Sequence, residues 1–431
     1  MRIFLLGLGS VGQSLLRIFK ENGLFDPDTF FVIDCDRSKK ELFIQNGGRG
    51  DHFIACMVND ENCLKLLTLL TPGDTFIDLA ENIRNLLLLN YCLAHGIHYL
   101  NASDSSCDEG NDHPFLHFRE FQDAKKRAIS GAATSIIEFG MNPGLVSAFV
   151  KAGIDEIVER DESDFVIENR THLKELIEKG RYAETASLLG ITKIIEVDND
   201  DQTVMIPYEK EQLYSTWNAM SFYSECSAHP QIAFGTKKEM DRCPNIHSSD
   251  QDGCWAMLEG SALQAAEHVY SPQGTVEGFI THHEEIYSIR EYLRFRSDAP
   301  TVYFVYSPCA YAKRSLAEFA DRTPESFHLI SRDEIRSGGE SVGIILYGTH
   351  FRPRYFGNYM LTANVAETAT ALQVSASLYA AFQYMCKHPH QGLLFPEDTD
   401  HHEVLNYAAE YLESYISEEI QINTLLADNS K

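Results

Sequence analysis

The first twelve residues, MRIFLLGLGSVG, place three glycines in the spacing G-x-G-x-x-G directly after the apolar run Ile3–Leu6. In this pattern one glycine makes a tight turn, the second lets backbone N–H groups approach a pyrophosphate, and the third lets the next helix pack on the strand. That helix begins with unsatisfied N–H groups and a positive dipole end. The alternative is a purely structural strand–helix turn. The pattern predicts a dinucleotide cradle made by Gly7, Gly9, Ser10, Val11 and Gly12.

A carboxylate follows the second predicted strand, Phe30–Ile33. Asp34 comes 22 residues after Gly12, close to the ~20 expected for an acceptor of the ribose 2′-OH. A carboxylate there accepts hydrogen bonds from the ribose and repels the 2′-phosphate of NADP. Asp36 adds a second negative charge, and Arg37 is the nearby cation that argues the other way. The sequence therefore favours NAD as the cofactor.

Charge and cysteine usage narrow the classes of partner and compartment. The 431 residues include 63 acidic and 36 basic ones, a net charge of −27, which disfavours nucleic acid and anionic membranes and suits a cationic substrate. Acidity is also common among cytosolic proteins. No run approaches the ~20 apolar residues of a membrane span, and the chain begins inside a strand, which leaves no signal peptide. Ten cysteines without a C-x-x-C pair indicate free thiols in a cytoplasmic protein.

Residues 1–144 alternate apolar runs with amphipathic stretches, the pattern of a parallel sheet. We predict an α/β protein whose N-terminal domain is a Rossmann-type doubly wound parallel sheet. Its six strands are predicted at Ile3–Leu6, Phe30–Ile33, Phe53–Met57, Thr75–Ile77, His98–Leu100 and Ser135–Phe139, with helices from Ser10 and over Asn59–Leu70, Asn82–His95 and Pro114–Ser130.

A second, α+β sheet domain is expected over residues 145–366, for substrate binding and dimerisation. The apolar helix predicted near residues 367–386 returns to the first domain, and residues 387–431 form a C-terminal helical tail. The segment 241–252 is expected to be irregular. Further helices are predicted at Leu145–Glu159 and Thr171–Leu189, and strands at Lys193–Val197, Gly278–Thr281, Thr301–Tyr306 and Val342–Leu346.

Ligands of doubly wound sheets bind at the carboxyl ends of the strands, so the residues that follow each strand are candidates. They are DLAEN at 78–82, NASD at 101–104 and GMNPG at 140–144. Ala80, Asn82 and Asn101 are expected near the cofactor. Asn142 precedes a proline, which favours an extended backbone there, and its amide can orient nicotinamide or a substrate amine. The plainer interpretation of Asn-Pro-Gly is a turn before the next helix.

Motifs throughout the chain resemble bacterial homospermidine synthase, a family close to saccharopine dehydrogenase in fold. They are GLGSVG and GMNPG in the first domain, and STWN at 215–218, GFITHHE at 278–284, YSPC at 306–309 and TALQV at 370–374. The resemblance implies that NAD oxidises putrescine, or spermidine, to an imine. The 4-aminobutyl group passes to a second putrescine, and the same NADH reduces the Schiff base, with release of ammonia or diaminopropane. It also implies a homodimer.

The resemblance also assigns roles to individual residues. Trp217 presents its ring to the cationic intermediate, an attraction of ~1–2 kcal/mol when desolvated. Glu225 holds the distal amine, and His282 moves protons, for which imidazole is suited near neutral pH. Asp198 is a further acid, with Glu196 as the alternative because the register of that segment is uncertain. Without the motifs, Trp217 would be taken for a core ring and Glu225 for a solvated charge.

Asn142 is implied to lie between nicotinamide and substrate. No metal is predicted, because adjacent histidines such as His282 and His283 point to opposite faces of a strand. The histidines at 388, 390, 401 and 402 are expected on surface loops. The segment NASDSSCDE lacks the Glu-Pro-Trp of the family after the fifth strand; Asp104 or Glu109 could replace that acid.

Two other functions compete with this one. A saccharopine or carboxynorspermidine dehydrogenase-type reductase would join an amine to an amino-acid aldehyde and consume NAD(P)H. It needs an arginine fork for a carboxylate, for which Arg352 and Arg354 are available. The second is an NAD-binding regulator without catalysis, against which the joint presence of Trp217, Glu225 and His282 argues.

Overall fold

The computed structural model describes the whole chain except residues 81–82, 104–113, 129–130, 251–253, 321, 414 and 422–431. Asn82, Asp104 and Glu109 therefore lie outside the described residues. The chain divides into two compact units, Met1–Leu145 with Ala371–Tyr411, and Val146–Thr370 with Leu412–Lys431. Residues 387–411, which the sequence analysis assigns to a tail, are part of the first unit.

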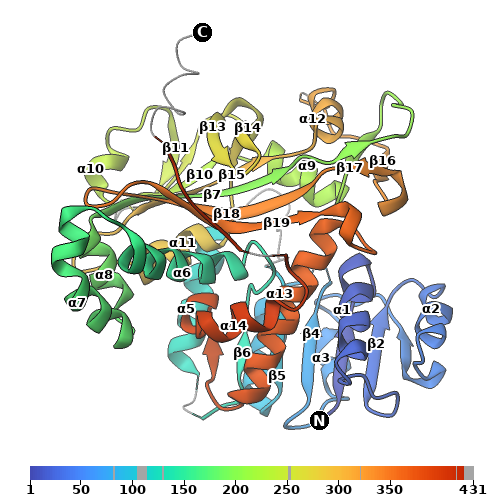
Figure 1. Ribbon diagram of the computed structural model, residues 1–431. Coiled ribbons are helices and arrows are strands. Elements are labelled where there is room, and N and C mark those ends of the chain that lie inside the picture. Colours follow the sequence, from blue (N-terminus) through green and yellow to red (C-terminus); the bar gives the residue numbers. More distant parts are fainter. Residues whose placement is uncertain are drawn as a thin grey trace. The chain divides into compact units, whose positions relative to one another are not determined.

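The first unit contains a seven-stranded sheet in the order β20-β6-β5-β4-β1-β2-β3, in which every pairing is parallel. This confirms the predicted α/β fold with a doubly wound sheet (Figure 1). Chain order reverses between β1 and β4, which makes that point the crevice where such sheets bind ligands. The strands are β1 (Ile3–Leu6), β2 (Phe30–Asp34), β3 (Phe53–Ala55), β4 (Thr75–Asp78), β5 (His98–Asn101), β6 (Ser135–Ile136) and β20 (Leu393–Leu394).

Two strands of this sheet differ from the sequence prediction. β6 ends at Ile136 rather than Phe139, and Glu138 in that segment has a positive φ of 54°, which a strand does not accommodate. β20 adds a seventh strand beside β6 through the pairs Leu393 with Ser135 and Leu394 with Ile136. The two leucines of β20 carry no local sequence signal that they pair with a strand so distant in the chain.

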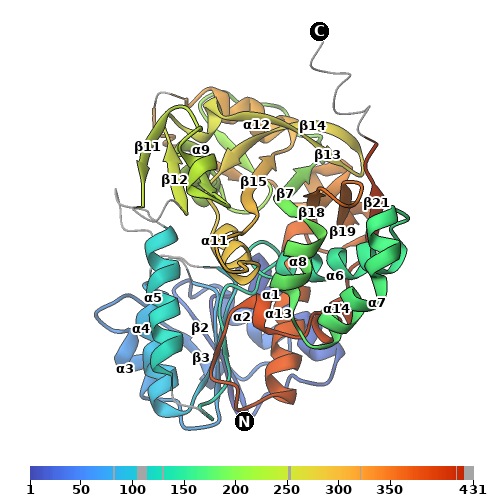
Figure 2. The ribbon, with the colours of Figure 1, turned by 90° about the vertical axis from the view of Figure 1, so that its left-hand side faces the viewer.

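Helices cover both faces of this sheet, with α3, α4 and α5 on one side and α1 and α13 on the other (Figure 2). α1 and α13 are joined by Phe19 and Phe382, whose ring centroids lie 4.8 Å apart, and by a 2.7 Å hydrogen bond between Ser14 and Ser375. The helices of this unit are α1 (Ser10–Glu21), α2 (Lys39–Gln45), α3 (Cys63–Leu67), α4 (Asn85–His95), α5 (Pro114–Arg127), α13 (Ala369–Lys387) and α14 (His401–Ala408).

The second unit has a ten-stranded sheet around β7, which pairs in parallel with β15 and antiparallel with β18. Its path is β11-β12-β10-β15-β7-β18-β19-β21, and β14 joins β15 to β13. These strands are β7 (Ile191–Asp200), β10 (Gln231–Ala233), β11 (Ile246–Ser249), β12 (Trp255–Leu258), β13 (Ala266–Ser271), β14 (Gly274–Thr281), β15 (Thr301–Ser307), β18 (Gly339–Gly348), β19 (Arg354–Leu361) and β21 (Ile416–Glu419).

Two short pairs complete the strands, β9 (Leu213–Ser215) with β16 (Phe327–Leu329), and β8 (Thr203–Val204) with β17 (Ile335–Ser337). The helix predicted over residues 171–189 is two helices, because Gly180 has a φ of 69° between them. β11 lies in the segment expected to be irregular. The helices are α6 (Leu145–Arg160), α7 (Asp164–Glu178), α8 (Tyr182–Leu189), α9 (Ala219–Ser227), α10 (Lys237–Met240), α11 (Glu285–Tyr292) and α12 (Ala310–Ala317).

The three glycines after β1 have different physical reasons to be glycine. Gly7 has a φ of 95°, and a Cβ there would lie 2.8 Å from the Leu79 carbonyl oxygen. A Cβ on Gly12 would lie 2.3 Å from the carbonyl oxygen of Gly7, so no side chain fits. A Cβ on Gly9 meets nothing within 4 Å. Gly7 and Gly12 are therefore required by the fold, whereas Gly9 borders open space at the beginning of α1.

This difference predicts opposite effects of two small substitutions. Gly12→Ala should destabilise the first unit by about 1–3 kcal/mol, because the methyl group must displace backbone. Gly9→Ala should leave stability nearly unchanged and weaken dinucleotide binding. Thermal unfolding and calorimetric titration with NAD measure both effects. Equal losses of stability in the two variants would contradict the assignment.

Candidate functional site

The beginning of α1 is open to a ligand. Gly9 is the N-cap of this helix and no side chain caps it, while Gly9 and Ser10 are exposed and Val11 is half-buried. The first backbone N–H groups of the helix therefore face solvent, as a pyrophosphate requires. Together with the space in front of Gly9, this geometry fits the phosphates of a dinucleotide.

Asp34, the last residue of β2, is fixed beside this turn. It is 5% exposed and accepts hydrogen bonds from the backbone N–H groups of Leu8 at 2.7 Å and Asp36 at 2.8 Å. Lys39 approaches the same carboxylate at 3.1 Å. The cation beside the predicted ribose acceptor is thus Lys39, and not the exposed Arg37 that the sequence analysis considered. The hydrogen bond from the Leu8 N–H, which lies in the glycine turn, orients the Asp34 carboxylate.

The other cofactor candidates lie where β4, β5 and β6 end. The Ala80 N–H donates to Asp78 at 3.1 Å. The Asn101 amide is buried and holds backbone, donating to the Ser103 carbonyl at 2.7 Å and accepting from the Glu138 N–H at 3.0 Å. Asn142 is half-buried within GMNPG, where Gly140 and Gly144 form a β-bridge.

One face of the sheet in the second unit carries a row of carboxylates. Glu196, Asp198 and Asp200 alternate along β7, so they point to the same side. Glu340 of β18 is paired with Asp200 and extends the row. All four are buried, Glu196 completely. Asp198 belongs to β7 itself, so the prediction that the strand stops at Val197 was wrong. We call these four side chains the carboxylate row.

Hydroxyl and amide donors satisfy one end of the carboxylate row. Thr216 donates to Asp200 at 2.7 Å, and Gln202 donates to it from its backbone N–H at 2.9 Å and its side chain at 3.0 Å. The Thr370 hydroxyl donates to Glu340. Burial nevertheless raises the pKa of Asp200 to about 6. Burial, with the charges of Asp198 and Asp200, raises the pKa of Glu340 well above its usual value.

Aromatic side chains lie beside this row. Tyr306 of β15 is paired with Asp198, and its hydroxyl accepts a 3.1 Å hydrogen bond from the indole N–H of Trp217. Phe222 of α9 packs edge-on against the Tyr306 ring, with centroids 6.0 Å apart. Trp217 itself is only half-buried. Its indole is therefore held by its N–H edge to Tyr306, which neighbours Asp198 of the carboxylate row.

Glu225 of α9 lies near the end of β14. Its carboxylate accepts a hydrogen bond from the Thr281 hydroxyl at 3.0 Å. Burial raises its pKa to about 6, while the charge of His283 and the bond from Thr281 act in the opposite direction. Glu225 is therefore a carboxylate above this pH, and the charge of His283 acts on it. The predicted residue His282 directly precedes His283 in the chain.

His283 and two glutamates form a compact cluster, which we call the His283 cluster. The Nδ1 atom of His283 is bonded directly to Glu285 and lies 3.5 Å from Glu284. Ligand atoms of His283, Glu285 and Glu196 all lie within 4.8 Å of one another. Burial opposes a charge on His283, yet the carboxylates, Glu285 first, raise its pKa to about 10. The imidazole is therefore protonated at neutral pH.

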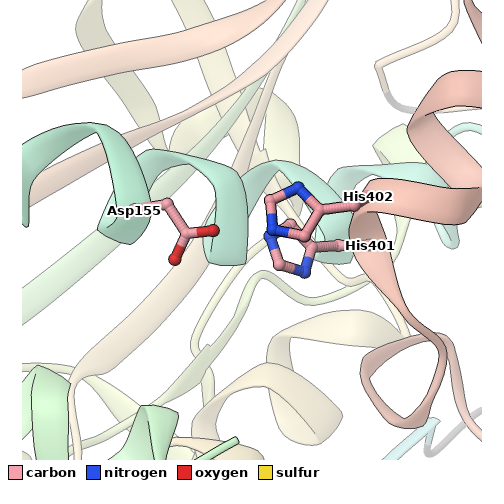
Figure 3. Close-up of side chains that lie close together, drawn as sticks. All are labelled: Asp155, His401 and His402. Carbon is pink, nitrogen blue, oxygen red and sulfur yellow. The ribbon is translucent and has the colours of Figure 1, made fainter. Parts of the chain in front are cut away.

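Of the histidines predicted on surface loops, His390 and His402 are exposed, whereas His401 is buried at the beginning of α14. His401 is 4% exposed, and its ring packs at a tilt against that of His402, with centroids 3.9 Å apart (Figure 3). The Asp400 side chain caps this helix through the N–H groups of His402 and Glu403. His388 bonds to Glu403 at 3.1 Å. The pattern Asp-x-x-Glu, with Asp400 at the N-cap and Glu403 in the first turn, is the sequence signal for the beginning of this helix.

Several residues of the second unit were given no role by the sequence analysis: Asp200, Tyr306, His283, Glu285 and Glu340. The alternation Glu196-x-Asp198-x-Asp200 carries a usable signal, because a strand places these three on one face. Glu340 and Glu285 come from distant segments, and only the pairing of β18 and the turn into α11 bring them there. Asp198, Glu225 and Trp217 do lie in one unit around one sheet face.

Comparisons with known proteins show which families the chain is similar to. Residues 3–135 match the family described as the saccharopine dehydrogenase NADP binding domain. The chain is 23% identical to the homospermidine synthase of Mesorhizobium japonicum, over 95% of this chain and 88% of the relative. It is 26% identical to the homospermidine synthase of Blastochloris viridis, over 95% and 89%.

The fold is similar to a solved structure, the homospermidine synthase of Legionella pneumophila in complex with NAD. The TM-score is 0.84 at 24% identity, and the match covers 97% of this chain and 91% of that one. Within the described residues, no helix has the length and apolar character needed to cross a membrane. The resemblance to homospermidine synthases is thereby confirmed in sequence and in fold over nearly the whole chain, and residues 3–135 match an NAD(P)-binding domain.

Proposed function

We propose that this chain is an NAD-dependent homospermidine synthase that joins two putrescine molecules and releases ammonia. The carboxylate row carries this proposal. Four carboxyl groups share one buried sheet face, and burying charged groups without compensation is costly. A substrate with two ammonium groups supplies that compensation, whereas an anionic or neutral substrate does not. Relatives that are similar over the same length are homospermidine synthases.

The residues have separate tasks in this proposal. Bound NAD supplies a hydride acceptor that returns the hydride within the same turnover, so the net reaction is redox-neutral. Glu225 binds the distal ammonium of the aminobutyl donor, and Asp198 contributes further negative charge. Trp217 faces the cationic carbon–nitrogen intermediate. His282 accepts and returns the proton of the reacting amine, and Asn142 orients the amide ring or the amine.

The reductase alternative lacks a comparable site at its two candidate arginines. The guanidinium of Arg352 bonds to Glu419 at 2.8 Å, and that of Arg354 donates to the Ser417 hydroxyl at 2.8 Å. Both arginines are therefore bound to β21. A carboxylate substrate would have to break these contacts, whereas a diamine finds the carboxylate row preformed.

We also propose that the protein acts in the cytoplasm as a homodimer. The nine cysteines in the described part of the chain are all free thiols, which suits a reducing compartment. The dimer rests on the resemblance to the family. Gel filtration with light scattering measures the mass directly, against 48.7 kDa for one chain.

Incubation with putrescine and a trace of NAD tests the reaction. We expect homospermidine in large molar excess over the cofactor, measured by mass spectrometry, because the hydride is returned in each turnover. Stoichiometric NAD(P)H consumption with an amino-acid aldehyde and an amine, and no product with trace NAD, would assign the chain to the reductases.

Trp217→Leu tests the aromatic contact. Loss of ~1–2 kcal/mol of cation–π attraction lowers kcat/KM for putrescine roughly 5- to 30-fold, while NAD affinity stays normal. Trp217→Phe is the matched control, since it keeps a ring and loses only the hydrogen bond to Tyr306. The phenylalanine variant should retain most of the activity. Equal activity of the leucine variant and wild type would remove the assignment.

Asp34→Ala tests cofactor choice. We expect NAD to lose affinity about 10-fold or more, because a ribose acceptor is lost, whereas NADP changes less. Lys39→Met is the control, because it removes the cation beside Asp34 and leaves the carboxylate. Calorimetric titration with each dinucleotide gives the two constants. An unchanged NAD/NADP preference in Asp34→Ala would place the ribose acceptor elsewhere, with Asp36 tested next.

A further inference from the structure

The His283 cluster contains a positive charge that the proposed reaction does not use. His283 follows β14 and its side chain is 12% exposed, while that of Glu285 is 1% exposed. The imidazole rests against the Phe304 ring, with centroids 4.5 Å apart. Its Nδ1 atom is bonded to Glu285. The ring is thus held by one hydrogen bond and one aromatic contact, with little access to water.

Carboxylates face His283 from α11, α9 and β7, whereas β15 contributes the Phe304 ring. Glu284 and Glu285 precede and begin α11, Glu225 comes from α9, and Glu196 comes from β7. The Phe304 ring carries no charge and no titratable proton, so it cannot balance the charge of these acids. In this cluster the imidazole is the one group that can carry a positive charge.

Glu196 and Glu285 are close enough to share a proton. Both oxygens of Glu196 and one oxygen of Glu285 are buried, and no donor reaches them among the described residues. Two ionised carboxylates in contact repel each other strongly, so one of such a pair holds a proton. Burial and the charge of Glu285 raise the pKa of Glu196 well above its usual value. His283 lowers that of Glu285 against the effect of burial.

The charges of the His283 cluster can be balanced by protons alone. Nδ1 of His283 is bonded directly to Glu285. The three groups can therefore satisfy one another with two protons, one on His283 and one between the carboxyls. The imidazolium then remains as a fixed charge two residues along the chain from Thr281, whose hydroxyl bonds to Glu225 at 3.0 Å.

We propose that His283 is a resident cation of the amine site and acts as a positioning residue that keeps Glu225 ionised. This inference rests on the proposed function, in which Glu225 binds the distal ammonium. Glu285 and Glu196 hold His283 protonated. The charge of His283 in turn favours the carboxylate form of Glu225, which burial disfavours. Without this cation, Glu225 would be neutral over part of the pH range in which an amine must be bound.

The sign of the pH effect follows from this arrangement. The pKa of Glu225 is raised by burial to about 6 with the opposing charge of His283 in place. Amine binding requires the carboxylate and is lost as the pH falls through this value. Replacing His283 by a neutral residue removes the opposing charge, so the pKa of Glu225 rises further. The acid limb of the pH profile must then move to higher pH.

The experiment compares pH profiles of kcat/KM for putrescine in wild type and His283→Asn, each as full-length protein with NAD. We expect the acid limb to shift upward by roughly one pH unit. Activity near pH 9 should return toward the wild-type value, which a merely structural defect would not allow. Glu285→Gln should shift the limb less, because two effects oppose each other. It removes a charge that raises the pKa of Glu225, and it weakens the protonation of His283.

His268→Asn is the matched control. His268 lies on β13 of the same unit, its side chain is 57% exposed, and it lies 3.8 Å from Glu277. Its pH profile should coincide with that of the wild type. Thermal unfolding and NAD titration of all variants verify that each is folded. An unshifted acid limb in folded His283→Asn overturns the proposal.

A second measurement is independent of catalysis. Nitrogen chemical shifts of ¹⁵N-histidine-labelled protein report whether both ring nitrogens carry protons, and the signal absent from His283→Asn assigns the residue. We expect a doubly protonated ring at pH 8. A neutral ring at pH 8, or one equivalent of a bound metal lost in His283→Asn, overturns the proposal. Absence of homospermidine from the wild-type protein would instead reject the proposed function and leave the protonation result intact.

Discussion

The burial of carboxyl groups on one face of β7 is the constraint on which the second unit depends. Glu196, Asp198 and Asp200 cannot all remain ionised without compensation, because desolvation of each charge costs several kcal/mol. The fold compensates in three ways. Hydroxyl and amide donors bond to Asp200, protons neutralise acids such as Glu196, and the imidazolium of His283 balances its neighbours. Under the proposed function, the ammonium groups of a diamine supply further positive charge at this face.

A central strand is a suitable support for such a row. β7 is bonded on both sides, to β15 over residues 301–307 and to β18 over residues 340–348. Alternate side chains on a strand are ~7 Å apart, so the carboxyl groups cannot move apart to relieve their repulsion. The strain of like charges is therefore relieved by a change in protonation or by a ligand, and not by a change in backbone. Sites on regular elements are held more accurately than sites on loops.

Sequence patterns were informative where the determinant is local. The turn at Gly7 to Gly12 and the strands β1, β2, β4 and β5 depend on neighbours in the chain, so spacing and apolar runs sufficed. The addition of β20 to the sheet and the meeting of Glu340 with Asp200 depend on residues more than a hundred positions apart. No short-range pattern records such pairing. His401 was misplaced for the same reason, since its burial comes from tertiary packing around α14.

Lys39 and His283 are both cations paired with a carboxylate, but they differ in exposure to solvent. Each places a cation against a buried carboxylate, Asp34 in the first unit and Glu285 in the second. The side chain of Lys39 is 28% exposed, so solvent weakens its attraction and the side chain can move aside. His283 is enclosed and cannot. In the arrangement that we propose, its charge is therefore a fixed part of the electrostatic field around Glu225.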